Sequence, residues 1–189
     1  MMKKVKTTDK LNPVQDIDCL VQEASKGSDS AFLALWKYFY PKVLNYLRRF
    51  TRDAEDVCSE AWIKIATAIK GFPGDGSEFQ AWIFTIARNL AIDYSRKQKR
   101  RGTQHELREG DWIARDTSSI EITDLLDRLP RDQAEVIMLR VVIGFSVHEV
   151  SQITNKSESN IRVIAHRGLN ALQKDLEASG YKKKDGGIK

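Results

Sequence analysis

Apolar residues recur every three to four positions through most of this sequence, and no two segments show the alternation that paired strands would need. The sequence therefore predicts an all-α protein. From Asp29, a candidate cap, the pattern indicates a helix that is interrupted or kinked near Pro41. Proline has this effect because it removes an amide donor and clashes with the preceding turn.

A second helix is predicted to begin after Arg52, where acidic residues gather in the first turn and complement the helix dipole. Gly71 and Pro73 end it, and the glycine-rich stretch PGDGSE forms a loop. The predicted buried face of this helix comprises Ala54, Val57, Ala61, Ile65 and either Ala68 or Ile69.

The segment from Phe79 to Arg101 carries two stripes at helical spacing. An apolar stripe suits a face turned toward a core, and it consists of Phe79, Ile83, Ile86, Leu90 and Tyr94. The second stripe combines an aromatic ring, polar groups and guanidinium groups at Trp82, Asn89, Asp93, Arg96 and Arg100. On its own this stripe is also compatible with a solvated face held by salt bridges.

Residues 102–119 are polar and lack a dependable period, which predicts a flexible linker between two small helical domains at 29–101 and 120–178. Residues 1–28 form an N-terminal extension to which the sequence assigns no role. Residues 179–189 form a polar tail.

The second domain ends in a predicted helix-turn-helix. Ser146 stands three residues before Glu149, the spacing of a capping box, and Asn155 suits a left-handed turn. Ser157 can cap the next helix, whose inner face is predicted to hold Ile161, Ile164, Leu169, Leu172 and Leu176. Its outer face carries Ser159, Arg162, Val163, His166 and Asn170, side chains of the kinds that meet base edges and phosphates in a major groove. An ordinary helical hairpin is the alternative.

Charge and cysteine usage narrow the function. The formal net charge is +5, and every charged residue from Arg96 to Arg108 is basic except Glu106. This concentration of positive charge favours a polyanionic partner. Cys19 and Cys58 lie far apart and suggest reduced thiols in a cytoplasmic protein. No apolar run approaches the roughly 20 residues of a membrane span, so no stable membrane insertion is expected. No second histidine or cysteine stands at ligand spacing beside His166, so His166 is expected to contact DNA rather than a metal. No cofactor is expected.

Four segments between Asp29 and Leu176 carry a family resemblance. They read DAEDVCSEAWIKI, FQAWIFTIARNLAIDYSRKQKRR, LLDRLPRDQAEVIMLR and GFSVHEVSQITNKSESNIRVIAHRGLNAL. Together they resemble the extracytoplasmic-function group of bacterial sigma factors. The resemblance implies an alternative sigma factor whose two domains bind the clamp and the flap of core RNA polymerase and direct promoter-specific initiation. It also implies control by an anti-sigma factor.

The resemblance assigns site residues to each contact. Core-polymerase binding falls to Asp56, Glu60 and Lys64, although Ser59 replaces a glutamine that is usual in the family. The minus-ten element, opened to single strands, falls to Ser77, Glu78, Phe79, Trp82, Asn89, Arg96, Lys97 and Arg100. The minus-thirty-five duplex falls to Ser157, Ser159, Asn160, Arg162, Val163, His166 and Arg167.

Two other functions compete with this interpretation. A conventional transcription regulator would explain the helix-turn-helix but not the aromatic and basic stripe. A nuclease would need carboxylates that converge on magnesium, and Asp53, Glu55, Asp56 and Glu60 are the candidates. No general base or phosphate-cradling loop accompanies them, so the protein is not expected to be an enzyme.

Overall fold

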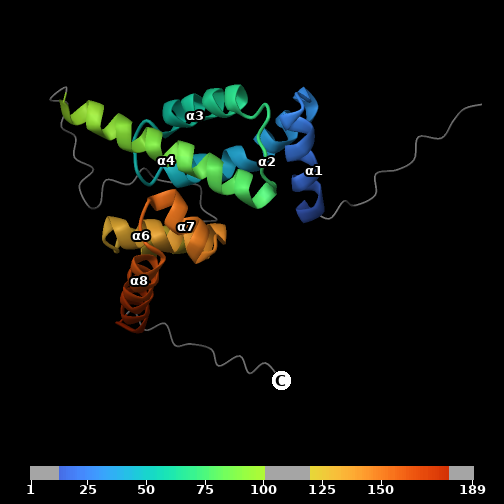
Figure 1. Ribbon diagram of the computed structural model, residues 1–189. Helices are drawn as coiled ribbons and strands as arrows, with labels where there is room; N and C mark the ends of the chain where they lie inside the picture. Colours follow the sequence, from blue (N-terminus) through green and yellow to red (C-terminus); the bar gives the residue numbers. More distant parts are fainter. Residues whose placement is uncertain (1–12, 101–119, 179–189) are drawn as a thin grey trace, which may run out of the picture. The chain divides into compact units, whose positions relative to one another are not determined.

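The computed structural model describes residues 13–100 and 120–178, and within these ranges the chain is helical with no strand (Figure 1). The predicted linker at 102–119, the polar tail at 179–189 and residues 1–12 of the N-terminal extension lie outside the described residues. The elements are α1 (Pro13–Ser25), α2 (Asp29–Leu47), α3 (Ala54–Ala68), α4 (Gly76–Arg100), α5 (Ile120–Asp127), α6 (Arg131–Ile137), the π-helix η1 (Met138–Ile143), α7 (Val147–Thr154) and α8 (Glu158–Ala178). None of these helices is both long enough and apolar enough to cross a membrane.

The chain divides into two compact units. The first contains α1, α2, α3 and α4 as far as Asp93. The second contains α5 to α8 together with Arg49–Arg52 and the end of α4. The all-α prediction is therefore confirmed for the described residues.

Helix α2 supplies one wall of the first core. Its buried side chains follow helical spacing at Leu35, Phe39, Val43, Tyr46 and Leu47. The helix continues through Pro41, so of the two predicted outcomes, an interruption or a kink, the interruption is wrong. Burial on both sides of the proline offsets the lost amide hydrogen bond. The cap is Ser28 rather than Asp29, since the Ser28 hydroxyl accepts from the Ala31 amide at 3.3 Å.

Helices α3 and α4 close this core. The predicted face of α3 is buried, and at its end Ile69 is buried whereas Ala68 is exposed. On α4 the predicted residues Phe79, Ile83 and Leu90 are buried, while Ile86 and Tyr94 are half-buried. Phe84 is also fully buried and meets the Tyr46 ring edge-on, with centroids 5.4 Å apart.

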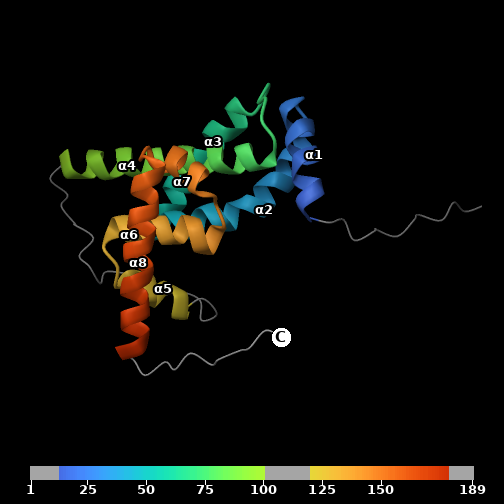
Figure 2. The same ribbon diagram turned by 60° about the horizontal axis from the view of Figure 1, so that its bottom comes forward.

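Helix α1 belongs to the first unit, although the sequence assigned its residues no role. It lies beside α2 in both ribbon views (Figures 1 and 2). Val21 and Ala24 are buried, three residues apart and thus on one face of α1. Their burial fixes α1 to the unit, which therefore extends beyond the start that the sequence predicted at residue 29.

The second unit is built on packing of α8 against α6 and α7. Between α6 and α7 the chain forms η1, which ends at Gly144 with φ +94°. Glycine suits that position because a side chain there would be strained. The core of this unit includes Leu126, Ile137, Leu139, Val150, Ile153 and Ile161.

Candidate nucleic-acid interface

The N-terminus of α4 is held by a reciprocal capping box. The Asp75 carboxylate accepts from the Glu78 amide at 2.8 Å, and the Glu78 carboxylate accepts from the Asp75 amide at 3.0 Å. Ser77 and Glu78, two of the predicted minus-ten residues, are exposed at this end. Aspartate three residues before glutamate is a capping-box variant that the sequence analysis did not use. The loop therefore has a defined exit into α4.

An aromatic group packs beneath this end of α4. Phe79 is fully buried, with ring centroids 5.9 Å from Phe39 and 5.7 Å from Phe72. The prediction that Phe79 contacts DNA is corrected, because a side chain inside the core presents no surface to a ligand. Trp82 is half-buried and lies against Phe72 at 5.0 Å, with an interplanar angle of 32°. Phe72, which the sequence analysis passed over, thus supports Trp82.

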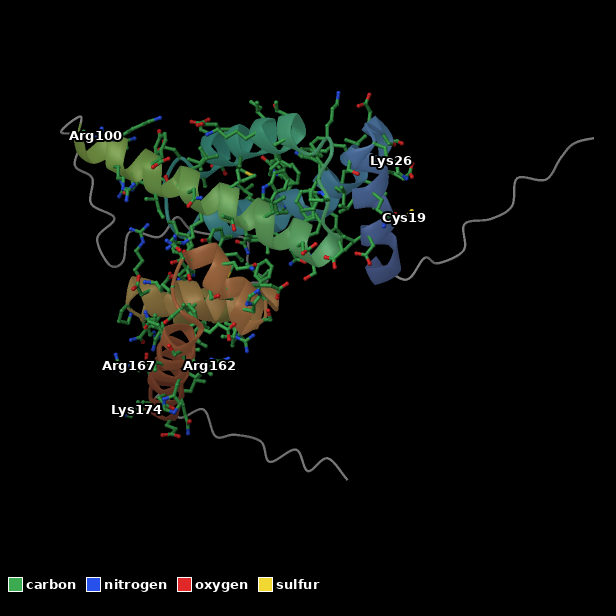
Figure 3. The ribbon with its side chains drawn as sticks, in the orientation of Figure 1. Cys19, Lys26, Arg100, Arg162, Arg167 and Lys174 are labelled. Carbon is green, nitrogen blue, oxygen red and sulfur yellow. The ribbon has the colours of Figure 1, made fainter. Side chains whose placement is uncertain are left out.

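The rest of the predicted minus-ten stripe is exposed along α4. It comprises Asn89, Arg96, Lys97 and Arg100. Figure 3 shows Arg100 at the C-terminal end of this helix. Trp82 and Arg100 are 18 residues apart, which corresponds to about 27 Å of helix at 1.5 Å per residue. A half-buried aromatic ring, an amide and several cations thus follow one another along α4, as a nucleic-acid strand requires.

The outer face of α3 presents the three residues predicted to bind polymerase. Asp56, Glu60 and Lys64 are all exposed, and the Lys64 ammonium lies 3.3 Å from the Glu60 carboxylate. Beside them Ile63 is 68% exposed and adds apolar surface to this face. Ile63 was not among the predicted residues, although its position, out of phase with the buried Ala61 and Ile65, indicates exposure. The face thus combines charge with an apolar centre, as protein interfaces do.

Two acidic residues of α3 are paired with basic side chains. The Glu55 carboxylate is paired with Arg48 at 2.7 Å, and the hydrogen bond from Arg48 lowers the pKa of Glu55. Glu60 is paired with Lys64. No group of three acidic, histidine or cysteine side chains is arranged to hold a metal ion in the residues that the structure describes.

The predicted helix-turn-helix is present in α7 and α8. Ser146 and Glu149 form the expected capping box, with both hydrogen bonds made. Asn155 adopts the left-handed conformation with φ +55°. The Ser157 hydroxyl accepts from the Asn160 amide at 3.3 Å, so Ser157 caps α8 as predicted. The turn was predicted correctly from the sequence, because each of these hydrogen bonds and backbone conformations depends on residues only a few positions apart.

Every residue predicted to meet the minus-thirty-five duplex is exposed, either at the cap of α8 or on its outer face. The cap is Ser157, and the residues of the outer face are Ser159, Asn160, Arg162, Val163, His166 and Arg167. On the opposite side Ile161 and Gly168 are buried. Leu169 is 48% exposed, so its predicted place on the inner face is wrong. Gly168 takes the inner position, since α6 approaches α8 so closely there that an added Cβ would lie 3.0 Å from Ile137 Cγ1.

Glu158 organises the charges at the start of α8. Its carboxylate accepts from Arg162 at 2.7 Å and lies 3.1 Å from His148 Nδ1 on α7. Hydrogen bonds from His148 and then Arg162 lower the pKa of Glu158. Figure 3 shows Arg162, Arg167 and Lys174 projecting from α8. Arg162 is therefore held by an intramolecular partner in the unbound protein.

Family comparison places both units in the sigma-70 class. The family model for Sigma-70 region 2 matches residues 35–101, and the one for Sigma-70 region 4 matches residues 119–172. The chain is 30% identical over 167 residues to the ECF RNA polymerase sigma factor SigX of Bacillus subtilis, covering 79% of this chain and 85% of SigX. It is 29% identical over 179 residues to the RNA polymerase sigma-H factor of Pseudomonas aeruginosa, covering 84% and 92% of the two chains.

Solved structures share the same fold. CnrH in complex with the cytosolic domain of CnrY matches with a TM-score of 0.60 and 21% identity, covering 86% of this chain and 98% of CnrH. RpoE of Bartonella quintana, in complex with the anti-sigma factor NepR, matches with a TM-score of 0.59 and 21% identity, covering 77% and 96%. The fold and these sequence matches define a sigma-70-type transcription initiation factor. More particularly, the chain belongs to the extracytoplasmic-function sigma factors of bacterial RNA polymerase.

Proposed function

We propose that three separate faces of this sigma factor carry its three contacts in promoter-specific initiation. The α3 face of Asp56, Glu60, Ile63 and Lys64 binds the clamp of core polymerase. The exposed side of α4 and the loop before it binds the unpaired minus-ten strand. The outer face of α8 reads the minus-thirty-five duplex. The protein performs no catalysis itself and acts in the cytoplasm, where its polymerase partner works.

The observation that carries this proposal is the construction of α4. Buried Phe79 and Ile83 anchor one side of the helix, while half-buried Trp82 and exposed Asn89 and Arg96 occupy another. An operator-binding regulator needs no such surface outside its helix-turn-helix. A strand separated from its complement, in contrast, is bound by stacking on aromatic rings and by cations along its backbone. Arg96 and Arg100 supply the positive charge.

The α3 face can be tested separately from the two DNA-binding faces. Replacing Asp56 and Glu60 together with alanine weakens binding to core polymerase, because charge complementarity aids association. Far-ultraviolet circular dichroism of this double variant stays unchanged, since both side chains are exposed. Retained affinity in a titration with core polymerase would remove α3 from the proposal.

The decisive experiment is run-off transcription with purified core polymerase on a genomic promoter library. A sigma factor produces specific transcripts with core enzyme and binds duplex DNA weakly alone. A conventional regulator binds its operator tightly without polymerase. Tight operator binding together with no polymerase-dependent transcript would overturn the proposed function.

Control by an anti-sigma factor is part of the proposal. CnrH and RpoE of Bartonella quintana were both solved in complex with another protein, in the second case an anti-sigma factor. The exposed apolar and charged α3 face offers a surface that such a partner can cover, with Ile63 at its centre. An anti-sigma factor that covers α3 competes directly with core polymerase, so a competition titration measures it.

A further inference from the structure

Helix α1 holds both ends of the loop between α3 and α4, which we define as Lys70–Asp75. At the first end, the Gly71 amide donates to the Ser25 carbonyl at 3.0 Å. At the second end, the Gly76 amide donates to Asp18 Oδ1 at 2.8 Å. Asp18 and Gly76 are 58 positions apart in the sequence, so neither bond follows from local geometry.

The contact at Gly76 leaves no room for a side chain unless residues of α1 shift. Gly76 is buried, and a Cβ added there would lie 2.6 Å from Asp18 Oδ1 and 2.7 Å from Ile17 Cγ2. Real Cβ atoms do not approach other atoms so closely. The absence of a side chain therefore lets α1 reach the first residue of α4.

The two acceptors belong to one rigid element. Asp18 and Ser25 are seven residues apart, which is about 10.5 Å along an α-helix. Burial of Val21 and Ala24 between them fixes the helix to its unit. Figures 1 and 2 both show α1 beside α2 and near the first turn of α4. The ends of the loop are consequently held at a fixed separation.

The loop leads directly into the proposed minus-ten surface. Phe72 within it packs against Trp82, and Asp75 forms the capping box with Glu78. A shift of Gly71 or Gly76 would therefore move the support of Trp82 and the exposed start of α4 together.

We propose that α1 is a brace for the α3–α4 loop and that Asp18 is a positioning residue for recognition of the unpaired minus-ten strand. This inference rests on the proposed function of the loop and α4. Asp18 itself does not touch DNA in this proposal. It acts through the Gly76 amide, whose position sets that of Ser77 and Glu78.

The first measurement tests the brace without DNA. Asp18→Ala removes the acceptor, and we expect the Gly76 amide of the full chain to exchange its hydrogen about tenfold faster, as loss of a charge-assisted hydrogen bond predicts. Asp18→Asn retains a side-chain oxygen and restores most of the protection. Glu23→Ala is the matched control, because Glu23 is an exposed acid of α1 whose carboxylate pairs with Lys26 rather than the loop. Unchanged exchange in Asp18→Ala overturns the inference.

The second measurement tests recognition. Holoenzyme reconstituted with each variant opens promoters randomised at every unpaired position of the minus-ten element, and sequencing of the opened templates gives base preference. We expect Asp18→Ala to reduce the strongest base preference several-fold while affinity for core polymerase stays unchanged. Asp18→Asn rescues the preference, and Glu23→Ala retains it. A general loss of stability would instead lower both promoter opening and affinity for core polymerase, without a selective change in base preference.

The outcomes separate the brace from the proposed function beneath it. If Ser77→Ala and Asn89→Ala alter base preference but Asp18→Ala does not, the brace is wrong and the proposed function stands. Faster exchange at Gly76 with wild-type preference also overturns it, because the bond would then be structural only. If Ser77→Ala and Asn89→Ala also leave preference unchanged, the minus-ten assignment itself fails.

Discussion

Glu158 shows how one side chain can tune DNA binding without making the contact itself. It holds Arg162 by a 2.7 Å ion pair and lies beside His148. Arg162 must exchange this partner for DNA when it binds a base or a phosphate. The carboxylate also places negative charge at a surface that we propose meets DNA. We therefore expect Glu158 to lower affinity for DNA and to raise selectivity between sequences.

Replacement of Glu158 with glutamine should strengthen duplex binding. We expect Glu158→Gln holoenzyme to bind a minus-thirty-five duplex several-fold more tightly and to discriminate less between sequences, since Arg162 is released and one negative charge is removed. Fluorescence anisotropy at two salt concentrations measures both effects. Glu177→Gln is the control, because Glu177 is an exposed acid near the other end of α8 that contacts Gln173. Weaker binding by Glu158→Gln would mean that Glu158 instead holds Arg162 in its productive position.

The two cysteines are expected to differ in reactivity because only one of them is buried. Burial raises the pKa of the Cys58 thiol to about 11, whereas Cys19 is exposed. At pH 8 roughly a thousandth of Cys58 is then thiolate, the reactive form. We expect a disulfide reagent to modify one thiol of the native chain rapidly and the second only after denaturation. Cys19→Ser should abolish the rapid phase. Two rapid phases in the native wild type would contradict the burial of Cys58.

At the scale of elements, close packing depends on glycine where two helices cross. Gly168 of α8 faces Ile137 of α6, and Ile137 is only 2% exposed. An alanine at this position would gain about 1 kcal/mol of helix propensity. Overpacking a core of low compressibility costs about 1–3 kcal/mol, so the steric effect outweighs the gain.

Gly168→Ala should therefore loosen the second unit. We expect amides of α6 and α8 to exchange hydrogen severalfold faster in the full chain, while amides of α2 and α3 keep their protection. Asn170→Ala provides the control for helix propensity, because Asn170 is exposed on the same helix. Slower exchange in Gly168→Ala would show that Ile137 can move aside at little cost.

The sequence predicted those features of the fold that depend on neighbours along the chain. The capping box of Ser146, the left-handed Asn155 and the outer face of α8 are local, and the structure confirms them. Features that depend on distant packing were missed or misplaced. Periodicity alone placed Leu169 on the inner face of α8, because the close approach of α6 at Gly168 could not be predicted from the sequence.

The candidate site shows the same division. Exposure of Asn89, Arg96 and Arg100 follows from their spacing, and it was predicted. The resemblance assigned Phe79 to DNA, but its ring is buried, as its place in the apolar stripe predicted, and three aromatic side chains contact it. The brace by α1 joins residues 58 positions apart, and no periodic signal reports such a pairing.

At the scale of the whole molecule, the proposed function divides promoter recognition between α4 with the loop before it and the outer face of α8. We expect Arg162→Ala to weaken minus-thirty-five binding by about 1–3 kcal/mol if it reads a base bidentately, and to leave opening intact on a template already melted. Asn89→Ala should keep minus-thirty-five binding but reduce open-complex formation. Permanganate footprinting on duplex and pre-melted promoters measures opening, and anisotropy measures duplex binding. Matching defect profiles for the two variants would contradict this division.

The brace also has a consequence for the order in which the protein is made. Synthesis at 5–20 residues per second adds the 58 residues from Asp18 to Gly76 in about 3–12 s. Helix α1 and its neighbour α2 leave the ribosome before the loop does. They can therefore pair first, so that both acceptors, at Asp18 and Ser25, are available when Gly71 and Gly76 emerge. The α3–α4 loop and the start of α4, which are synthesised late, can thus dock on α1, which is synthesised first.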